Sequence, residues 1–190
     1  VLLGASTHEG EEDVLLRIFH DLLFLFPNLL LILAPRHMNR ISRVNSMALR
    51  HGYNPELFSK TDSLSADKNI LIIDEMGLLP SIYCCAHVAF VGGSLVPLGG
   101  HNMLEGVRAG CPIIMGPFIE NIEDIVREFE ENGGMSIVND APALKTEIKR
   151  LMSDSSLRAK MKTAANAILE TNKGSLETTE TGIVDAINRN

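Results

Sequence analysis

A glycine-rich stretch at residues 88–105, VAFVGGSLVPLGGHNMLE, combines the residue types of an anion-binding site. Its apolar start predicts a buried strand, and its end predicts the first turn of a helix. Glycine pairs at 92–93 and 99–100 lie between them. Glycine lets the main chain approach a ligand closely, and a helix N-terminus offers unpaired N–H groups and partial positive charge. The stretch therefore predicts a phosphate-binding loop with Ser94 as a hydroxyl donor, against the alternative of a tight strand-to-helix turn.

Four further polar residues suit the parts of a nucleotide. Arg36 is the best candidate cation for a phosphate, because a guanidinium binds oxyanions through two hydrogen bonds; the alternative is a solvated arginine. Glu105, one turn into the predicted helix, can accept two hydrogen bonds from a ribose diol, or it can be an exposed acid favoured by the helix dipole. Asn102 can bind phosphate or cap the helix, and His101 can contact a ligand or merely stack.

The sequence offers no convincing catalytic base. His8 beside Glu9 suggests acid–base chemistry, but a single histidine in a loop is usually polar surface, so we assign it no role. The glycine loop lacks G-x-G-x-x-G and G-x-x-x-x-G-K-[ST], which argues against a dinucleotide oxidoreductase and a P-loop NTPase. No zinc-site spacing is present, and we expect the three cysteines (84, 85 and 111) to be reduced and buried in a cytosolic protein.

Apolar runs alternate with helical patterns along most of the chain. Strands are predicted at residues 1–5, 29–34, 56–60, 70–73, 88–91, 111–115 and 135–138. A first helix is predicted to begin in the loop at 6–12, whose hydroxyls would cap it, and to end at Phe26. Further helices are predicted at 39–51, 78–85, 101–109, 122–129, 142–152, 157–170 and 176–187, and a loose loop at 62–69. Because the strands are apolar on both faces, we expect an α/β fold with a Rossmann-like, doubly wound parallel sheet and helices on both faces.

Helical spacing also predicts which side chains face the core. In the first helix these are Val14, Leu15, Ile18, Leu22 and Leu25, and in the helix at 122–129 they are Ile122, Ile125, Val126 and Phe129.

Polar clusters follow several of these strands, and in a parallel sheet all such ends lie on one edge, where ligands bind. We therefore expect these clusters to converge: Ser6-Thr7-His8, Arg36-His37, Glu75-Met76-Gly77, Gly92-Gly93-Ser94, and Gly116-Pro117-Phe118 with Asn121.

Length and charge limit the remaining possibilities. A chain of 190 residues suits one domain, and its net charge of −7 argues against a nucleic-acid surface across the whole chain. No apolar run is long enough to span a membrane, and no signal peptide is visible. The chain begins inside an apolar stretch without an initiator methionine, which indicates a fragment of a longer protein.

Several motifs occur together in an order and at intervals that resemble the C-terminal half of the 3-deoxy-D-manno-octulosonic acid (Kdo) transferases, GT-B glycosyltransferases of bacterial lipopolysaccharide synthesis. The Gly-Gly-Ser-Leu-Val-Pro-x-Gly-Gly-His-Asn-x-x-Glu core is specific, whereas a shorter Gly…Glu pattern indicates only a GT-B nucleotide-sugar enzyme. The motifs are ASTHEGEE (5–12), APRH (34–37), MG (76–77), FVGGSLVPLGGHNMLE (90–105) and GP (116–117) with Asn121.

The resemblance implies that residues 1–190 form a single domain that binds the donor CMP-Kdo. The missing N-terminal half would bind the lipid A precursor lipid IVA, supply the general base and associate with the membrane, at the cytoplasmic face of the bacterial inner membrane. The family works without a bound metal or cofactor and has no nucleic-acid partner. We therefore expect the fragment to bind CMP or CMP-Kdo weakly and to be inactive alone.

The resemblance also implies roles for particular residues. Arg36 would meet the CMP phosphate, Met76 and Gly77 would line the nucleotide pocket, and Asn102 and Glu105 would hold phosphate and ribose. Gly93 and Ser94 would approach the phosphate or sugar, and His37, Gly100 and His101 complete the predicted substrate-binding set. The sequence departs from the usual family pattern at Met38, Leu78, Met103 and Gly106.

Two other readings stay open. One is a GT-B transferase or epimerase that uses a UDP-sugar. The other is a non-catalytic nucleotide-binding α/β domain.

Overall fold

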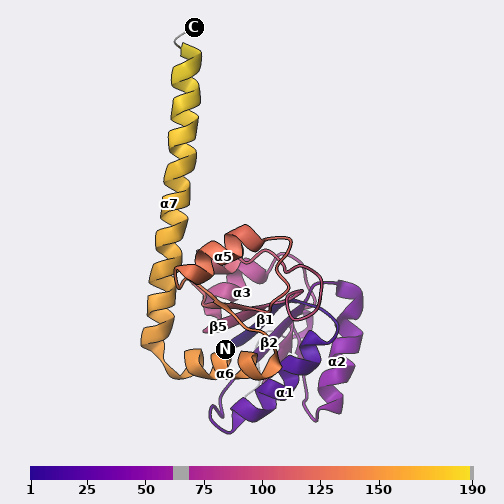
Figure 1. The fold of residues 1–190 in the computed structure, drawn as a ribbon. Coiled ribbons are helices and arrows are strands. Elements are labelled where there is room, and N and C mark those ends of the chain that lie inside the picture. Colours follow the sequence, from indigo (N-terminus) through magenta and orange to yellow (C-terminus); the bar gives the residue numbers. More distant parts are fainter. Residues whose placement is uncertain (62–68, 189–190) are drawn as a thin grey trace.

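Seven parallel strands form one sheet in the order β3-β4-β2-β1-β5-β6-β7 (Figure 1). The computed structural model describes residues 1–61 and 69–188. The strands are β1 (Leu2–Thr7), β2 (Leu31–Pro35), β3 (Glu56–Leu57), β4 (Ile70–Ile72), β5 (Val88–Val91), β6 (Ile113–Met115) and β7 (Ser136–Ile137). Every neighbouring pair is parallel, which confirms the predicted sheet.

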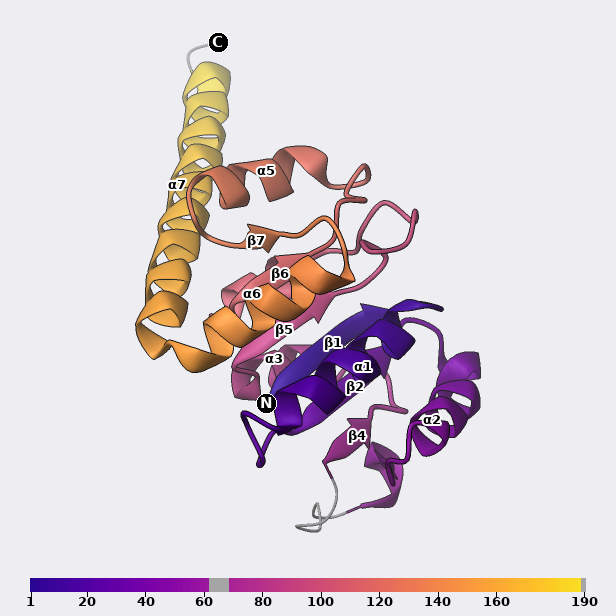
Figure 2. The ribbon, with the colours of Figure 1, turned by 60° about the horizontal axis from the view of Figure 1, so that its bottom comes forward.

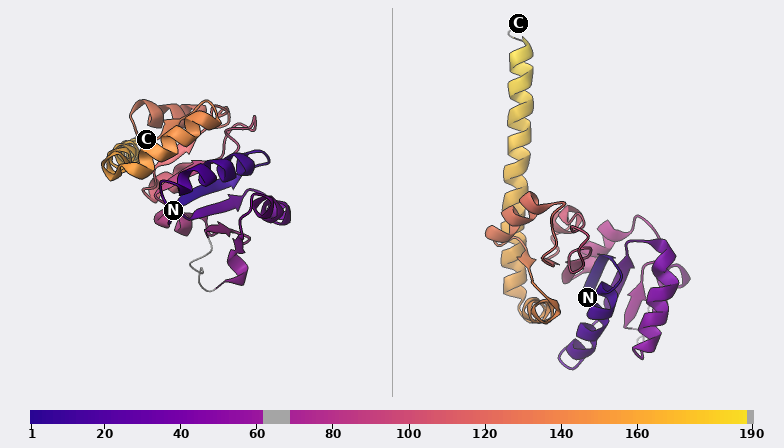
Figure 3. Two further views of the ribbon diagram at one scale, coloured as in Figure 1. Left: turned by 90° about the horizontal axis from the view of Figure 1, so that it is seen from below. Right: turned by 45° about the vertical axis from the view of Figure 1, so that its right-hand side comes forward.

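Helices cover both faces of the sheet. They are α1 (Glu11–Leu23), α2 (Ile41–Arg50), α3 (Leu79–Cys85), α4 (Leu104–Arg108), α5 (Glu123–Glu131), α6 (Ala141–Ser153) and α7 (Ser155–Asn188), with 3₁₀ turns at Met38–Arg40 and Phe58–Lys60. Side chains of α1, α2 and α6 pack on one face, where Figure 2 shows α1 and α6, and those of α3, α4 and α5 pack on the other. Figure 3 gives two further views of these layers. The fold is therefore doubly wound.

Successive strand residues enter two separate apolar layers. On β1, Leu2 packs in the layer that contains α1, whereas Leu3 packs in the layer that contains α3 and α4, and both side chains are fully buried. A strand buried on both faces is apolar at every position, which explains why the strands are continuous apolar runs in the sequence.

Two helix predictions were wrong in extent. α4 begins at Leu104, so residues 101–103 belong to the loop before it, and Glu105 lies at the helix start rather than one turn in. The predicted helices at 157–170 and 176–187 form one helix, α7, which extends away from the body in Figure 1. The residues between them contain no proline, and one glycine weakens a helix without ending it.

The inward faces of two helices also differ from prediction. α1 ends at Leu23, so Leu25 lies beyond it and is 53% exposed, while Leu16 and Phe19 are buried instead. In α5, Ile125 is 40% exposed, because burial concentrates on Val126 and Phe129.

Three local predictions have different outcomes. Cys84 and Cys85 are exposed, contrary to the expected burial, because the short α3 leaves them on its outer side; Cys111 is buried, and all three thiols are free. No hydroxyl caps α1, whose first residue follows Gly10 at a φ of 95°. The predicted loose loop falls almost wholly on residues 62–68, outside the described residues.

The sheet brings the predicted site loops together. Since β4, β2, β1 and β5 are adjacent, the loops that follow them meet at one edge. The order of strands reverses between β1 and β5, and such switch points form ligand-binding crevices. No helix of the described residues has the length and apolar character needed to cross a membrane.

Candidate functional site: a pocket at the C-terminal edge of the sheet

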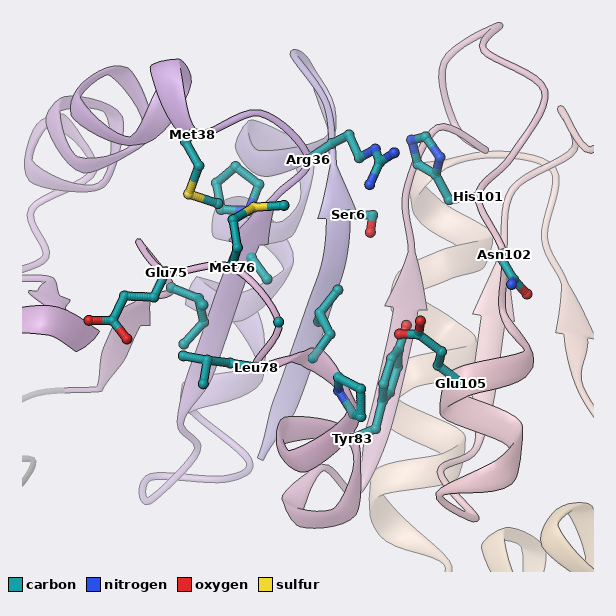
Figure 4. A pocket seen from close by; sticks show the side chains of 16 residues that line it. Ser6, Arg36, Met38, Glu75, Met76, Leu78, Tyr83, His101, Asn102 and Glu105 are labelled. Atoms are coloured by element: carbon teal, nitrogen blue, oxygen red, sulfur yellow. The ribbon is translucent and has the colours of Figure 1, made fainter.

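A pocket of about 390 Å³ opens at this edge (Figure 4). The end of β1 and the loops after β2, β4 and β5 contribute to it, together with the starts of α3 and α4. Its lining residues are Ser6, Ala34, Pro35, Arg36, Met38, Ile73, Glu75, Met76, Gly77, Leu78, Leu79, Pro80, Tyr83, His101, Asn102 and Glu105. The predicted convergence in the pocket is thus confirmed for three of the five clusters, through Ser6, Arg36 and residues 75–77. The loop after β5 reaches the pocket through His101 and Asn102 and not through its cluster at residues 92–94.

Arg36 and Glu105 place opposite charges in different parts of the pocket. Figure 4 shows Arg36 beside His101, and Glu105 beside Tyr83. Both charged side chains are exposed. Within the described part of the chain, neither the Arg36 guanidinium nor the Glu105 carboxylate has a hydrogen-bond or ion-pair partner. A cation and an acceptor without internal partners are available to a ligand that carries both a phosphate and hydroxyl groups.

Tyr83 forms the floor of the pocket near Glu105 and is only 2% exposed. Burial raises the pKa of its phenol, and the nearby Cys111 and Glu105 add to the shift, so the hydroxyl stays protonated and can donate. Gly106 makes room for the ring: a Cβ at this position would lie 2.7 Å from Cε1 of Tyr83 and 2.6 Å from Cδ1 of Ile113.

An apolar wall completes the pocket on the side of β2 and β4. Pro35, Met38 and Met76 contribute to it, and the Met76 side chain is 71% exposed. Gly77 adopts a φ of 81°, which a non-glycine residue rarely does, and it lets the chain turn sharply there. A flexible apolar wall of this kind can pack against the face of a nucleobase.

The glycine loop does not offer its N–H groups to a ligand. The Glu11 carboxylate occupies it: Oε2 accepts from Gly93 N (2.9 Å) and His8 N (2.8 Å), and Oε1 accepts from Ser94 N (3.1 Å) and Leu95 N (3.0 Å). Burial raises the pKa of Glu11, while these four backbone donors act in the opposite direction. Because both oxygens accept, the bonded form is the carboxylate. The loop predicted to bind a phosphate therefore does bind an anion, but that anion is the carboxylate of Glu11 from the same chain.

Ser94 is likewise committed to the protein. Its side chain is fully buried, its hydroxyl donates to the Val91 carbonyl at 2.5 Å, and it accepts from Gly116 N at 2.8 Å. A Cβ at Gly116 would lie 2.1 Å from the Ser94 carbonyl oxygen. Ser94 thus joins the loop after β5 to the end of β6, and it is not a hydroxyl donor to a ligand in this structure.

A second buried acid lies next to Glu11. Glu12 has no exposed surface and forms a two-bond ion pair with Arg40, at 2.5 Å from Nη1 and 3.1 Å from Nη2. The Thr7 hydroxyl donates to the same carboxylate at 3.0 Å. This pair holds the loop after β2 against the start of α1.

Three histidines meet beside the pocket, which one of them, His101, lines. Nε2 of His8 lies 2.6 Å from Nε2 of His101, and the His37 ring stands edge-on to His8 with ring centroids 5.4 Å apart. Burial lowers the pKa of His101 to about 4, with further lowering by His8, Arg36 and His37. His8 is thus in contact with the site, contrary to the expectation of polar surface. Within the described residues, no three potential ligands of His, Cys, Asp or Glu type are arranged to hold a metal ion.

Two smaller features adjoin these groups. Asn102 Oδ1 accepts from Leu104 N at 2.9 Å, so the side chain supports the entry to α4. Its amide N–H groups have no hydrogen-bond partner among the described residues. Ser6 lines the pocket and has a φ of 50°, which is rare for a residue other than glycine. It lies at an irregularity in β1, where the pairing with β2 shifts register between Ala5 and Thr7.

Comparison with known proteins identifies the fold family. The family model described as "Glycosyl transferases group 1" matches residues 8–167. The chain belongs to this glycosyltransferase family. The match covers the loops that line the pocket, the glycine loop bound by Glu11 and most of the sheet.

The most similar proteins include the Kdo transferases. The chain is 34% identical over 178 residues to the 3-deoxy-D-manno-octulosonic acid transferase of Haemophilus influenzae, covering 93% of this chain and 42% of that protein. It is 30% identical over 152 residues to the corresponding transferase of Aquifex aeolicus, covering 80% and 42%. The chain therefore spans well under half the length of these relatives.

A solved structure matches nearly end to end. The C-terminal CMP-Kdo binding domain of WaaA from Acinetobacter baumannii superposes with a TM-score of 0.84 and 30% identity, covering 88% of each chain. Within the glycosyltransferase group 1 family, the chain is thus the counterpart of a Kdo transferase C-terminal domain, as the motifs predict.

Not all predicted site residues line the pocket. Arg36, Met76, Gly77, His101, Asn102 and Glu105 do. His37 lies outside it against His8, and Gly93, Ser94 and Gly100 are buried in the loop behind it.

Sequence reasoning missed Glu11, Met38 and Tyr83. For Glu11 the sequence shows only an acid pair at the start of a predicted helix, because the glycine-rich loop that Glu11 binds follows more than 80 residues later. Met38 directly follows the Arg36-His37 cluster, and Tyr83 lies in a predicted helix on the ligand side of the sheet; neither has a motif of its own.

Proposed function

We propose that this chain is the donor-binding half of a glycosyltransferase that moves Kdo from CMP-Kdo to the lipid A precursor lipid IVA in lipopolysaccharide biosynthesis. The observation that carries the proposal is the pocket in which Arg36 and Glu105 have no partner within the described residues. Arg36 would bind the phosphate, Glu105 would accept from the ribose hydroxyls, and the wall of Pro35, Met38 and Met76 would pack on the cytosine. The similarity to a CMP-Kdo binding domain supports the same ligand.

The reaction defines what this half must do. The oxygen of the acceptor hydroxyl bonds to the anomeric carbon of Kdo, the bond from that carbon to the phosphate oxygen breaks, and CMP leaves with the electron pair. Arg36 would stabilise the charge that develops on the departing phosphate. The proton of the acceptor hydroxyl needs a base. We place that base in the remainder of the parent enzyme, so this chain alone would bind donor without turnover.

The remaining parts of the proposal concern the parent enzyme. It would meet lipid IVA and the cytoplasmic face of the bacterial inner membrane through its other half, and it would work without a metal or other cofactor, with no nucleic-acid partner. Metal independence is tested by assaying the whole enzyme after exhaustive treatment with EDTA. Activity that falls and returns with added Mg²⁺ would contradict it.

Calorimetric titration tests the donor assignment. The chain should bind CMP, and more weakly UMP and UDP. Glu105→Gln removes the charged acceptor for the ribose and should weaken CMP binding by about ten- to a hundredfold, the loss expected for a hydrogen bond to a charged group. Glu131→Gln, at the exposed end of α5, is the matched control and should bind like the wild type.

Two results would redirect the proposal. A clear preference for UDP would indicate a UDP-sugar transferase or epimerase. Equal CMP affinity in Glu105→Gln and wild type would remove Glu105 from the site and favour a non-catalytic nucleotide-binding domain.

A further inference from the structure

The contact between His8 and His101 has the geometry of a hydrogen bond between two rings. The two Nε2 atoms are 2.6 Å apart, the ring centroids are 4.9 Å apart, and the ring planes differ by 17°. The centroid separation is close to the N–N distance plus two ring radii, so the two Nε2 atoms point at each other in nearly coplanar rings. One nitrogen must carry a proton and the other a lone pair, since two N–H groups cannot occupy this contact.

We propose that His8 is a positioning residue for donor binding: its Nε2–H donates to Nε2 of His101 and thereby holds His101 in the tautomer that presents Nδ1–H to the anionic part of the donor. This inference rests on the proposed function and deepens it, because it adds a second donor group next to Arg36. His101 lines the pocket and His8 does not, so His8 acts through His101.

The orientation of His101 supports this arrangement. A Cβ at Gly93 would lie 3.1 Å from both Cδ2 and Nε2 of His101, so that edge of the ring packs against its own loop. Nδ1 lies on the opposite edge. Figure 4 shows the ring beside the Arg36 guanidinium. A neutral Nδ1–H donor is useful there, because an anion attracted by Arg36 can accept from it.

The surrounding charges favour His8 as the donor. His101 is lowered in pKa by burial and then by His8, Arg36 and His37. The pKa of His8 is also lowered, by burial and then by His37, Arg40 and Arg36, but the Glu12 carboxylate opposes that shift. When the pair takes up one extra proton, that proton therefore resides on His8, which then donates its Nε2–H to His101.

Glu11 fixes the distance between the two rings. Its Oε2 accepts from the backbone N of His8, in the loop after β1, and from the backbone N of Gly93, in the loop that carries His101. The two loops are thus joined by one buried carboxylate. A contact held from both sides by backbone bonds is suited to selecting one tautomer.

Long-range ¹H–¹⁵N NMR of the histidine rings tests the tautomer without any ligand. In the free chain, His101 should carry its proton on Nδ1. His8→Gln should keep this tautomer, because the glutamine amide can donate from about the position of Nε2, whereas His8→Leu should release it. His20→Leu, remote from the pocket, is the control. An Nε2–H tautomer in the wild type, or an unchanged His101 in His8→Leu, would overturn the inference.

Binding of cytidine 5′-(methyl phosphate) tests the consequence, since this diester has no ionisation near neutral pH. His8→Leu should bind about two- to tenfold more weakly than wild type, and His8→Gln should recover most of the loss. A bound anion favours protonation of the His8–His101 pair. The affinity of the wild type for this diester should therefore rise by about two- to fivefold as the pH falls from 7.5 to 5.5, and His8→Leu should lack this rise.

The outcomes separate this inference from the proposed function. A wild-type chain that binds no cytidine nucleotide would reject the proposed function and the role in donor binding, while the NMR result still decides whether His8 sets the tautomer. Normal binding by the wild type with equal affinity and equal pH dependence in His8→Leu would reject the inference and leave the proposed function standing.

Discussion

Two groups of charged residues lie near the loop after β5, and they use charge differently. The first, here called the clamp, consists of Glu11, Glu12, Thr7, Arg40 and the backbone of residues 93–95. Its two acids are fully buried: Glu11 accepts hydrogen bonds from the backbone of residues 93–95, and Glu12 accepts them from Thr7 and Arg40. In the pocket, Arg36 and Glu105 are exposed and lack partners within the described residues. The paired charges of the clamp hold the fold, whereas the unpaired charges of the pocket are available to a ligand.

The comparison corrects the obvious reading of a glycine-rich loop. Backbone N–H groups at such a loop attract an anion, and here the anion is a glutamate of the same chain. A carboxylate that accepts several N–H bonds makes the loop rigid, and the rigid loop then presents His101 and Asn102 to the pocket. The glycines therefore serve the site indirectly.

The largest expected effect comes from the clamp. Glu11→Gln replaces one accepting oxygen with an NH₂ group that faces backbone donors, and it should lower the free energy of unfolding by about 3–5 kcal/mol, as when one partner of a buried charged contact is removed. Urea denaturation measures this. Glu9→Gln, in an exposed pair with Arg43, is the control and should change stability by less than about 0.5 kcal/mol. Equal losses in both variants would mean that the clamp does not hold the fold.

The pocket should show the opposite pattern. Arg36→Gln should weaken CMP binding by about 1.5–3 kcal/mol, because it removes a charged hydrogen-bond donor, and it should leave stability within about 0.5 kcal/mol of wild type. Calorimetry and urea denaturation measure the two quantities. Arg50→Gln, at the exposed end of α2, should change neither. Unfolding of Arg36→Gln at much lower urea would show that Arg36 is structural.

Gly106→Ala tests the packing that connects helix α4 to the pocket floor. The added Cβ would lie 2.6 Å from Ile113 and 2.7 Å from Tyr83. Both side chains are buried, so the variant should lose about 1–2 kcal/mol of stability from overpacking and should also bind CMP more weakly, since Tyr83 must move. Thermal unfolding and calorimetry provide the readouts. Unchanged values for both would show that the ring has free space beside it.

The smallest effect concerns pH. The pKa of His101 is lowered from 6.5 to about 4, so between these pH values the unfolded chain binds more protons than the folded one, and stability falls as the pH falls. After allowance for solvent screening, His101 should account for about 1 kcal/mol of the loss between pH 6.5 and 4. His101→Gln should show a correspondingly shallower decline in urea denaturation. Parallel curves for the two proteins would exclude His101 as the source.

Strand chemistry made much of the fold predictable from sequence. A sheet covered on both faces needs strands that are apolar at every position, and such runs are visible at 70–73 and 88–91. The parallel order then places Arg36 and Met76 near Glu105 without knowledge of any contact. Helix ends were less predictable, because Leu104 rather than His101 starts α4 only as a result of how the preceding loop packs.

The filled loop could not be predicted because its cause is three-dimensional. An acid in the first turn of a helix is ordinarily a solvated residue favoured by the helix dipole. Glu11 departs from that rule because β1 and β5 are neighbours, which brings the start of α1 against residues 93–95. His8 was misjudged for the same reason: its partner, His101, is 93 residues away in the sequence.

A crystal structure of the chain with CMP tests the central claim most directly. The account predicts the phosphate on Arg36 and His101, the ribose hydroxyls on Glu105, and the Glu11 carboxylate still bonded to the loop at residues 93–95. A phosphate bound to those backbone N–H groups, with Glu11 displaced, would contradict it.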